Sequence, residues 1–490
     1  MRPTRACLFT ALLACAGVAQ AQNSPTASDD SLSWKGITLY GAVDIGLQYQ
    51  THGVPSSDYF PAGTEAPITK NSNGSVTAVT PSNLSQSRIG LAGNEPLIGD
   101  WAGVFRLETF FNPQSGDISD GLKSLVLNNG RALASQSTNV DTSVAGQLFA
   151  GAAYAGFSSP TYGSLTFGRH PTPLADGIAK YDPAGASQAF SLIGFSGTTA
   201  GGGDTEDRRL DQSLKYTAKY DWLHLGALYQ FSGSTGSTNT ATQISAGADF
   251  AGASIDGYYA KKYDAVSVSA LSAAQVSGLS TLCTGSVTPP ANPAGAQCFS
   301  SNNSLSGTIS DNTTYAVMAS YNFGAPAPTL YAGYEHIKFA NPNTPYEPGQ
   351  VIIGGYVLAY VNNTAYGPAN GPPSDKTLQV YWAGLKWPIT PQLDLIAAYY
   401  GYKQNSYATG KDAGCSSSIS SGCSGREDTA SALLDYRFSK RFDAYIGTFW
   451  SEVQDGLAAG YQLTDLNAKG VSTFNSASTL TSTMGIRFRF

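Results

Sequence analysis

The last twelve residues of the chain, 479–490, constrain its fold more than any other stretch. Two sets of side chains alternate along it: Leu480, Met484, Ile486, Phe488 and Phe490 form one, and Thr481, Thr483, Gly485, Arg487 and Arg489 form the other. An alternation with a period of two predicts a β-strand with one apolar and one polar face. We expect lipid to cover the apolar face, and we expect the chain to repeat such strands until they close into a barrel.

The composition favours many strands over helices. Charged residues make up 13% of the 490 residues, which is about half their share in a soluble globular protein. Aromatic residues make up 11%, and there are 54 glycines and 28 tyrosines. Small residues suit the inside of a barrel, and aromatic residues suit the two belts where a membrane meets water.

The N-terminus has the pattern of a cleaved signal peptide over residues 1–21. Arg2 and Arg5 precede a short apolar core at 7–18, and Ala19-Gln20-Ala21 is a small-residue cleavage site. Lipidation at Cys15 is an alternative. Residues 22–36 are polar, and we expect a flexible segment there, followed by a barrel over 37–490. Without Arg2 and Arg5 the chain has 26 basic and 34 acidic residues, and this acidic balance argues against nucleic acid as a partner.

Strands follow one another in a regular rhythm of tight turns and long loops. We expect tight turns near 94–100, 158–162, 218–221, 250–251, 324–328, 388–391 and 439–441. We expect long loops near 51–85, 112–146, 170–207, 232–241, 263–312, 340–375, 405–427 and 454–477. This rhythm predicts an all-β, antiparallel, up-and-down transmembrane barrel of about sixteen strands, or eighteen if the apolar run 351–361 forms another hairpin.

Tryptophans and bulky strands add two expectations. Trp101, Trp222 and Trp387 each stand next to a tight turn, which favours an aromatic girdle over ordinary core packing. The strands near 378–387 and 442–453 carry bulky side chains on both faces, and a contact between protomers would explain them.

The cysteines outside the signal peptide form two local pairs, Cys283 with Cys298 and Cys415 with Cys423, each in a polar loop. Secretion permits disulfides, and we expect both pairs to be bridged. The alternative is a metal site, but the spacings lack Cys-x2-Cys pairs and neighbouring histidines.

Several motifs, in order along the chain, resemble those of the trimeric Gram-negative outer-membrane porins. They are Ile37-Thr38-Leu39-Tyr40-Gly41, Ser87-Arg88-Ile89-Gly90, Gly163-Ser164-Leu165-Thr166-Phe167-Gly168-Arg169, Asp435-Tyr436-Arg437-Phe438-Ser439-Lys440-Arg441 and Gly485-Ile486-Arg487-Phe488-Arg489-Phe490. The resemblance implies a homotrimer in outer-membrane lipid of a Gram-negative cell, through which small hydrophilic solutes and ions diffuse passively. Phe490 is similar to the family's terminal assembly signal.

The resemblance also implies that the third long loop, 170–207, folds into the lumen and narrows it. Its acidic residues Asp176 and Asp182 would then face a basic row. Arg88, Arg106, Arg169, Arg208 and Arg209 are the candidates for that row. Opposed charges of this kind orient dipolar solutes and set ion preference. The alternative is that these charges are solvated and have no specific role. Gly151 stands where the family often has a basic residue, so one member of the row is missing.

Enzyme motifs are absent from the sequence, and the four histidines have no ligand spacing. We therefore expect no enzyme, no cofactor and no metal. His170 is a further candidate for the constriction, or a solvated loop histidine. Two functions compete with general diffusion: a substrate-specific channel, suggested by the aromatic residues and enlarged loops, and a surface receptor or adhesin that uses the cysteine-bearing loops.

Overall fold

The computed structural model describes residues 32–52, 75–119, 148–195, 208–232, 240–268, 307–340, 376–406, 423–456 and 476–490. Strands dominate these ranges. They are β1 (Leu32–Trp34), β2 (Ile37–Gln50), β3 (Val76–Pro81), β4 (Arg88–Pro96), β5 (Ala102–Phe110), β6 (Ala152–Ser159), β7 (Gly163–Pro171), β8 (Arg209–Tyr220), β9 (Leu223–Gln230), β10 (Ala241–Phe250), β11 (Ala253–Val268), β12 (Gly307–Asn322), β13 (Thr329–Ala340), β14 (Lys376–Pro388), β15 (Leu393–Gln404), β16 (Gly425–Arg437), β17 (Phe442–Asp455) and β18 (Ser476–Arg489). In the same ranges a helix, α2 (Pro173–Tyr181), and a short 3-10 helix, η2 (Ile193–Phe195), follow β7.

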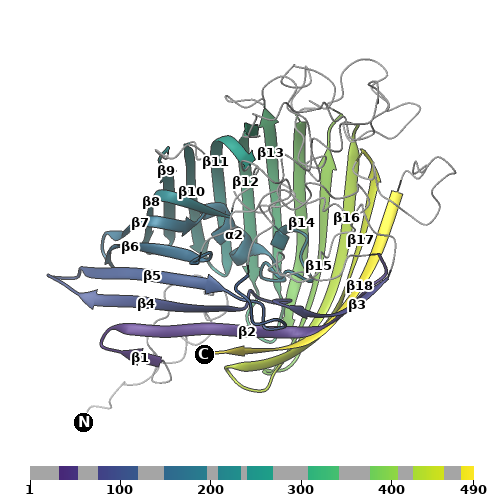
Figure 1. Ribbon diagram of the computed structural model, residues 1–490, viewed down its shortest axis with the longest axis horizontal. Coiled ribbons are helices and arrows are strands. Elements are labelled where there is room, and N and C mark those ends of the chain that lie inside the picture. Colours follow the sequence, from purple (N-terminus) through teal and green to yellow (C-terminus); the bar gives the residue numbers. More distant parts are fainter. Residues whose placement is uncertain are drawn as a thin grey trace, which may run out of the picture.

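The strands form one antiparallel sheet that closes on itself. Each strand from β4 to β18 pairs with the next along the chain, and β18 returns to pair with β2. β3 and β4 pair with the two halves of β2, so together they make one crossing of the wall. β1 is a three-residue strand that pairs only with β2. The result is a barrel of sixteen crossings, as expected, and the sheet curves around α2 (Figure 1).

The two faces of the wall differ as the alternation predicted. On β18 the apolar residues Leu480, Met484 and Ile486 are 43%, 49% and 46% exposed, whereas Thr481 and Thr483 are buried. On the other strands large apolar side chains also lie on the outer face, and the inner face carries polar residues together with some buried apolar ones. A closed sheet satisfies every backbone hydrogen bond within the wall, so the outer face can meet hydrocarbon.

The tight turns lie where the sequence predicted them, and tryptophans accompany them. Trp101 precedes β5, Trp222 lies in the turn between β8 and β9, and Trp387 stands near the end of β14. All three are exposed, as residues of an aromatic girdle are. The C-terminal Phe490 exchanges two backbone hydrogen bonds with Gly41 of β2, at 2.9 and 3.1 Å.

Several strands are longer than the sequence suggested. β3 lies within the predicted loop 51–85, and β11 and β12 extend into the predicted loop 263–312. β1 lies within the segment predicted to be flexible, where Lys35 and Gly36 both have positive φ and form a two-residue hairpin turn. These pieces are short or lie at strand ends next to long loops, so they offer too few alternating residues for the period of two to be recognised.

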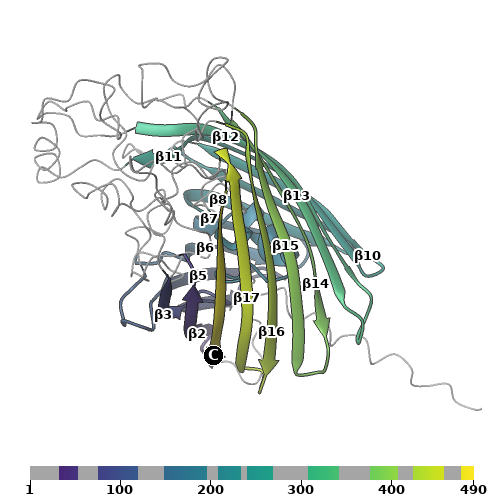
Figure 2. The same ribbon diagram turned by 90° about the vertical axis from the view of Figure 1, so that its right-hand side faces the viewer.

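Part of the bulk on β14 and β17 faces inward, where the chain itself covers it, and the expected protomer contact at these strands stays a prediction. Tyr445 and Phe449 point inward and are buried. Phe190, which follows α2, packs edge-on against Tyr445 at 6.3 Å between ring centroids. The Trp382 Nε1–H of β14 donates to the Tyr181 carbonyl at 3.0 Å. The segment 172–195 thus covers part of the inner face of both strands. Figure 2 shows β14 and β17 in one curved wall, with β15 and β16 between them.

Some predictions fall outside the described residues. They are the signal peptide 1–21, the possible hairpin 351–361, and Cys283, Cys298 and Cys415. Cys423 takes part in a disulfide, and its pairing with Cys415 stays a prediction.

Candidate functional site

Helix α2 lies against the inner side of the wall, and its sequence explains why it starts and stops there. Thr172 is the N-cap, and its side chain accepts a hydrogen bond from the Ala175 N–H at 3.1 Å. Pro173 occupies the first turn, where its missing donor costs nothing. Asp176 in the first turn and Lys180 in the last turn both oppose the helix dipole favourably. The buried face of α2 packs against β9 to β13.

A polar network fixes the C-terminal end of α2. The Lys180 ammonium lies 3.0 Å from the Asp256 carboxylate of β11. His224 of β9 bridges Asp256 and Asp249, with its ring nitrogens 2.7 and 3.2 Å from their oxygens. The Tyr181 hydroxyl shares a 2.7 Å hydrogen bond with Ser254. These contacts hold the helix on strands β9 to β11.

Asp182 ends α2 and ties the following turn to β15. Its carboxylate accepts hydrogen bonds from the Tyr400 hydroxyl at 2.6 Å and from the backbone N–H groups of Ala184 and Ala186 at 3.1 and 2.7 Å. Asp182 is buried. Burial raises the pKa of this carboxyl above its ordinary value, although the hydrogen bonds oppose the rise. The sequence identified Asp182 as an acid facing the pore, and the structure places it under the turn.

Near the other end of α2, Glu108 of β5 is surrounded by arginines. The Arg106 Nη2 donates to Glu108 at 2.7 Å, and its Nε donates to the Tyr40 hydroxyl at 2.6 Å. The Arg88 Nε lies 3.6 Å from the same carboxylate. Arg106 and Glu108 are almost fully buried, whereas the Arg88 side chain is 19% exposed. Arg88 is therefore the member of this group that water reaches.

Three further arginines continue the row: Arg169 on β7, Arg208 just before β8 and Arg209 at the start of β8. Arg169 pairs with Asp211 at 2.5 Å and donates to the Ala150 carbonyl. The Arg208 Nη1 donates to the Gly194 carbonyl at 3.0 Å, which links the row to the end of the inner segment. Burial lowers the pKa of the Arg208 guanidinium, while Asp176 and Asp182 raise it.

Arg209 lies beside Gly151, the position where the resemblance led us to expect a basic residue. Its Nε donates to the Gly151 carbonyl at 2.8 Å, and its guanidinium lies 4.8 Å from the centre of the Phe110 ring. A Cβ at Gly151 would collide with the side chain of Glu108. The glycine thus makes room for Glu108, and Arg209 supplies the charge from the opposite side.

Lys215 completes the group, and we name the whole set the arginine cluster. The Lys215 ammonium lies 2.5 Å from the Asp176 carboxylate of α2, so Lys215 joins the helix to the wall. The arginine cluster contains six basic residues, Arg88, Arg106, Arg169, Arg208, Arg209 and Lys215, and three acidic residues, Glu108, Asp176 and Asp211. Among the described residues it therefore carries a net charge of three positive units.

The structure brings together all five arginines that the sequence singled out, and it places Asp176 of α2, which the sequence also singled out, beside them. Asp182 lies at the far end of the helix. His170 is buried, stacks on Tyr154 at 4.8 Å and shares a 2.8 Å hydrogen bond with Ser213. Sequence reasoning missed Lys215, which the alternation along β8 would place on the inner face.

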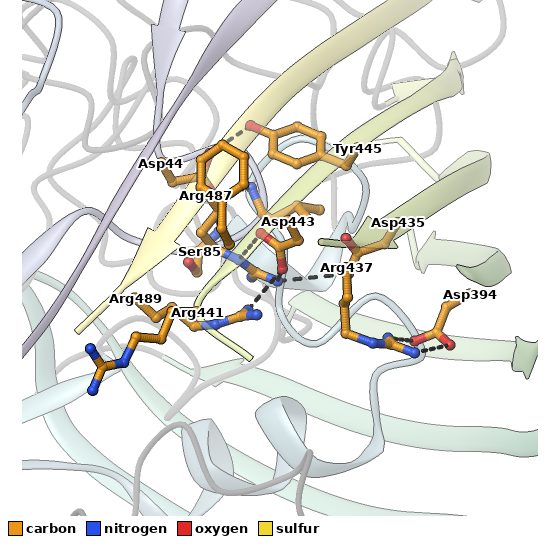
Figure 3. Close-up of polar contacts among 12 residues, drawn as sticks. Asp44, Ser85, Asp394, Asp435, Arg437, Arg441, Asp443, Tyr445, Arg487 and Arg489 are labelled. Carbon is orange, nitrogen blue, oxygen red and sulfur yellow. Dashed lines mark hydrogen bonds and ion pairs between the residues drawn. The ribbon is translucent and has the colours of Figure 1, made fainter. Parts of the chain in front are cut away.

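A second charged network lies at the short-turn end of the barrel (Figure 3). Asp443 forms ion pairs with Arg487 at 2.7 Å and with Arg489 at 2.9 Å. Arg437 pairs with Asp394 on the neighbouring strand. Asp394, Asp435 and Asp443 pair with Arg437, Arg487 and Arg489, so this network is close to neutral, unlike the arginine cluster.

The described ranges contain no helix with the length and apolarity needed to cross a membrane. In the same ranges, no group of three or more histidine, cysteine, aspartate and glutamate residues could hold a metal ion.

Comparisons with known proteins agree with this architecture. A family model for Gram-negative porins matches residues 9–455. An outer membrane porin protein of Bordetella pertussis is 27% identical over 227 residues, which cover 46% of this chain and 47% of that protein. The chain thus matches about half the length of this curated relative.

Solved structures share the fold. An anion-selective porin from Comamonas acidovorans is 17% identical with a TM-score of 0.55, over 93% of this chain and 99% of that one. OmpT of Vibrio cholerae, solved in a trimer form, is 12% identical with a TM-score of 0.50, over 93% of this chain and 99% of that one.

Proposed function

Since the chain belongs to the Gram-negative porin family, we propose that it forms a water-filled channel in the outer membrane through which small hydrophilic solutes and ions diffuse passively. One observation carries the proposal: a closed barrel has an apolar outer face and a polar inner face lined by charged residues. Such a wall separates lipid from water without any unpaired backbone group.

The segment 172–195 is the proposed constriction. α2 is fixed to β9–β11 through Lys180 and Tyr181, and the following turn is fixed to β15 through Asp182. The segment therefore touches the inner wall at several strands, and such contacts suit a fixed restriction of the lumen. Asp176 presents its carboxylate toward Lys215 and is the member of the arginine cluster that α2 contributes. Asp182 is proposed to hold the segment's shape in addition to adding negative charge.

The proposed ion preference is for anions. The arginine cluster has a net charge of three positive units among the described residues, and its charges lie beside the proposed constriction. A low-dielectric wall focuses such a field into the water-filled space, raises the local concentration of anions and lowers that of cations. The predicted preference is weaker at high salt because mobile ions screen the charges.

We also propose a homotrimer that reaches the outer membrane after cleavage of a signal peptide at residue 21. The porin fold and the trimer form of OmpT support the assembly, and the basic and apolar pattern of residues 1–21 supports export. The terminal Phe490, paired with Gly41 beside β2, is the proposed assembly signal. Chemical cross-linking of the detergent-solubilised protein should give a species of three chains, and a monomer alone would contradict the trimer.

Uptake into proteoliposomes tests the channel function. Vesicles that contain the purified protein should swell in solutions of small sugars, at a rate that falls as the sugar becomes larger and does not saturate with concentration. Vesicles without protein provide the control. Absence of swelling would overturn the proposal, and saturation with one solute would favour a substrate-specific channel.

A further inference from the structure

The second crossing of the wall is interrupted, and the interruption has a definite size. Ile45 of β2 pairs with Pro81, and Ala42 pairs with Arg88. Two residues of β2 therefore face six residues of the neighbouring chain, 82–87, which we name the inward bulge. Pro81 lacks a donor, and Ser82 has a φ of 59°, so the chain leaves the sheet at this point.

The carboxylate of Asp44 gathers the inward bulge. Its Oδ2 accepts the backbone N–H groups of Leu84 and Ser85 at 2.9 and 2.8 Å, and its Oδ1 accepts that of Asn83 at 3.3 Å. The Tyr445 hydroxyl of β17 donates to the same Oδ1 at 2.5 Å, as Figure 3 shows. Asp44 is fully buried. All four donors converge on this one side chain, and only a carboxylate offers enough acceptor sites for all of them.

The inward bulge in turn holds the distal part of the proposed constriction. The Asn83 carbonyl accepts hydrogen bonds from the Ser187 hydroxyl at 2.7 Å and from the Ala189 N–H at 3.0 Å. Next to these bonds, Leu84, Ala189, Phe190 and Tyr445 belong to one buried apolar group. Residues 187–190 thus contact the wall through the inward bulge.

We propose that Asp44 is a positioning residue that latches residues 187–190 to the wall through the inward bulge. This inference rests on the proposed function, because the latched segment is the proposed constriction. The substitution Asp44→Asn presents one amide donor toward a site made entirely of donors, so the backbone of 83–85 loses part of its support. The segment 187–190 then separates from the wall more often, although α2 stays attached through Lys180 and Asp182.

Chemical labelling tests the latch without any measurement of transport. Ala189 is 3% exposed, so a cysteine introduced by Ala189→Cys should react slowly with a water-soluble methanethiosulfonate reagent. In the folded protein, Asp44→Asn should raise the labelling rate at position 189 at least tenfold. The protein without Ala189→Cys corrects for the native cysteines. Equal labelling rates with and without the substitution Asp44→Asn would overturn the latch.

A matched control uses another buried carboxylate of the same region. Asp435 of β16 is 6% exposed and lies 3.7 Å from the Arg487 guanidinium. Unlike Asp44, it accepts no hydrogen bond from the backbone of the inward bulge. Asp435→Asn should leave the labelling rate at position 189 unchanged. An increase as large as that caused by Asp44→Asn would overturn the specific role of Asp44.

Two milder variants keep the inference testable if Asp44→Asn does not fold. Tyr445→Phe removes the hydroxyl that donates to Asp44 and keeps the ring that packs on Phe190, and Ser187→Ala removes one bond to the inward bulge. Each should raise the labelling rate about threefold, and no change in either would overturn the latch. Swelling of vesicles is a separate readout, so a protein that labels as predicted but does not transport would refute the channel and leave the latch intact.

Discussion

Replacing Arg88 by glutamine should lower the anion preference of the channel about threefold. Arg88 is the best choice within the arginine cluster because its side chain is partly exposed and its Nε makes no hydrogen bond to the described residues. Glu108 keeps its shorter contact with Arg106 at 2.7 Å when Arg88 is removed. The substitution therefore removes one of three net positive charges and leaves the buried pair in place.

The size of the effect follows from the charge that is lost. A unit charge about 7 Å from the pore axis is worth about 0.6 kcal/mol in water, and about half of this remains in ~0.1 M salt, where the Debye length is ~10 Å. An anion loses this stabilisation and a cation gains the same amount. The ratio of their permeabilities then changes by about 0.6 kcal/mol, or about threefold.

The assay is the zero-current potential of a planar bilayer that separates two concentrations of potassium chloride. Arg426→Gln is the matched control, because Arg426 lies on the outer face of β16 with a side chain that is 56% exposed. Arg88→Gln should move the potential toward the potassium value, and Arg426→Gln should not. Equal shifts in the two variants, or no shift in either, would refute the placement of the arginine cluster beside the ion path.

Four further outcomes follow from the same contacts. Glu108→Gln removes a negative charge from the arginine cluster, so it should raise the anion preference about threefold in the same assay; a fall would contradict the charge count. Met484→Arg places a charge on the lipid face, where 49% of Met484 is exposed, and it should cost about 2–4 kcal/mol in urea unfolding; an unchanged midpoint would argue against lipid contact. Trp382→Phe removes the bond to Tyr181 and should cost about 1 kcal/mol and increase current noise; a quiet channel of full stability would show that this bond does not fix α2. Asp182→Asn tests how stability depends on pH. Burial raises the pKa of the Asp182 carboxyl above its ordinary value of 3.8, so the folded protein binds this proton more tightly than the unfolded chain does. In the wild type, the contribution of Asp182 to stability is therefore complete below pH 3.8 and falls as the pH rises through the raised pKa of the folded state. The free energy of unfolding of Asp182→Asn should accordingly depend less on pH. Parallel curves of unfolding free energy against pH for the two proteins would contradict this.

The alternation of side chains predicted the wall of the barrel because a strand has only two faces. Leu480 and Thr481 were assigned to opposite faces from their spacing alone, and the structure confirms both. Local pattern was sufficient for these features because each depends on residues that are adjacent in the sequence or in the sheet. The approach of Arg88 and Arg106 was predicted in a different way, from the resemblance to the porins, which implied a basic row on neighbouring strands.

Contacts between distant parts of the chain were not predictable in this way. The inward bulge depends on a pairing in which two residues of β2 face the six residues 82–87. The alternation of side chains in the sequence does not predict such a change of register. Asp182 and Tyr400 meet across 218 positions of sequence. The strand near 442–453 was recognised as bulky on both faces. The chain itself covers its inward residue Tyr445, and the alternation does not reveal what covers a face.

The zero-current potential of the unmodified protein tests the central claim most directly. A bilayer that contains the purified protein should conduct, and in a potassium chloride gradient its potential should lie on the chloride side of zero. A silent bilayer would contradict the channel, and a potential on the potassium side would contradict the view that the arginine cluster governs the ions that pass.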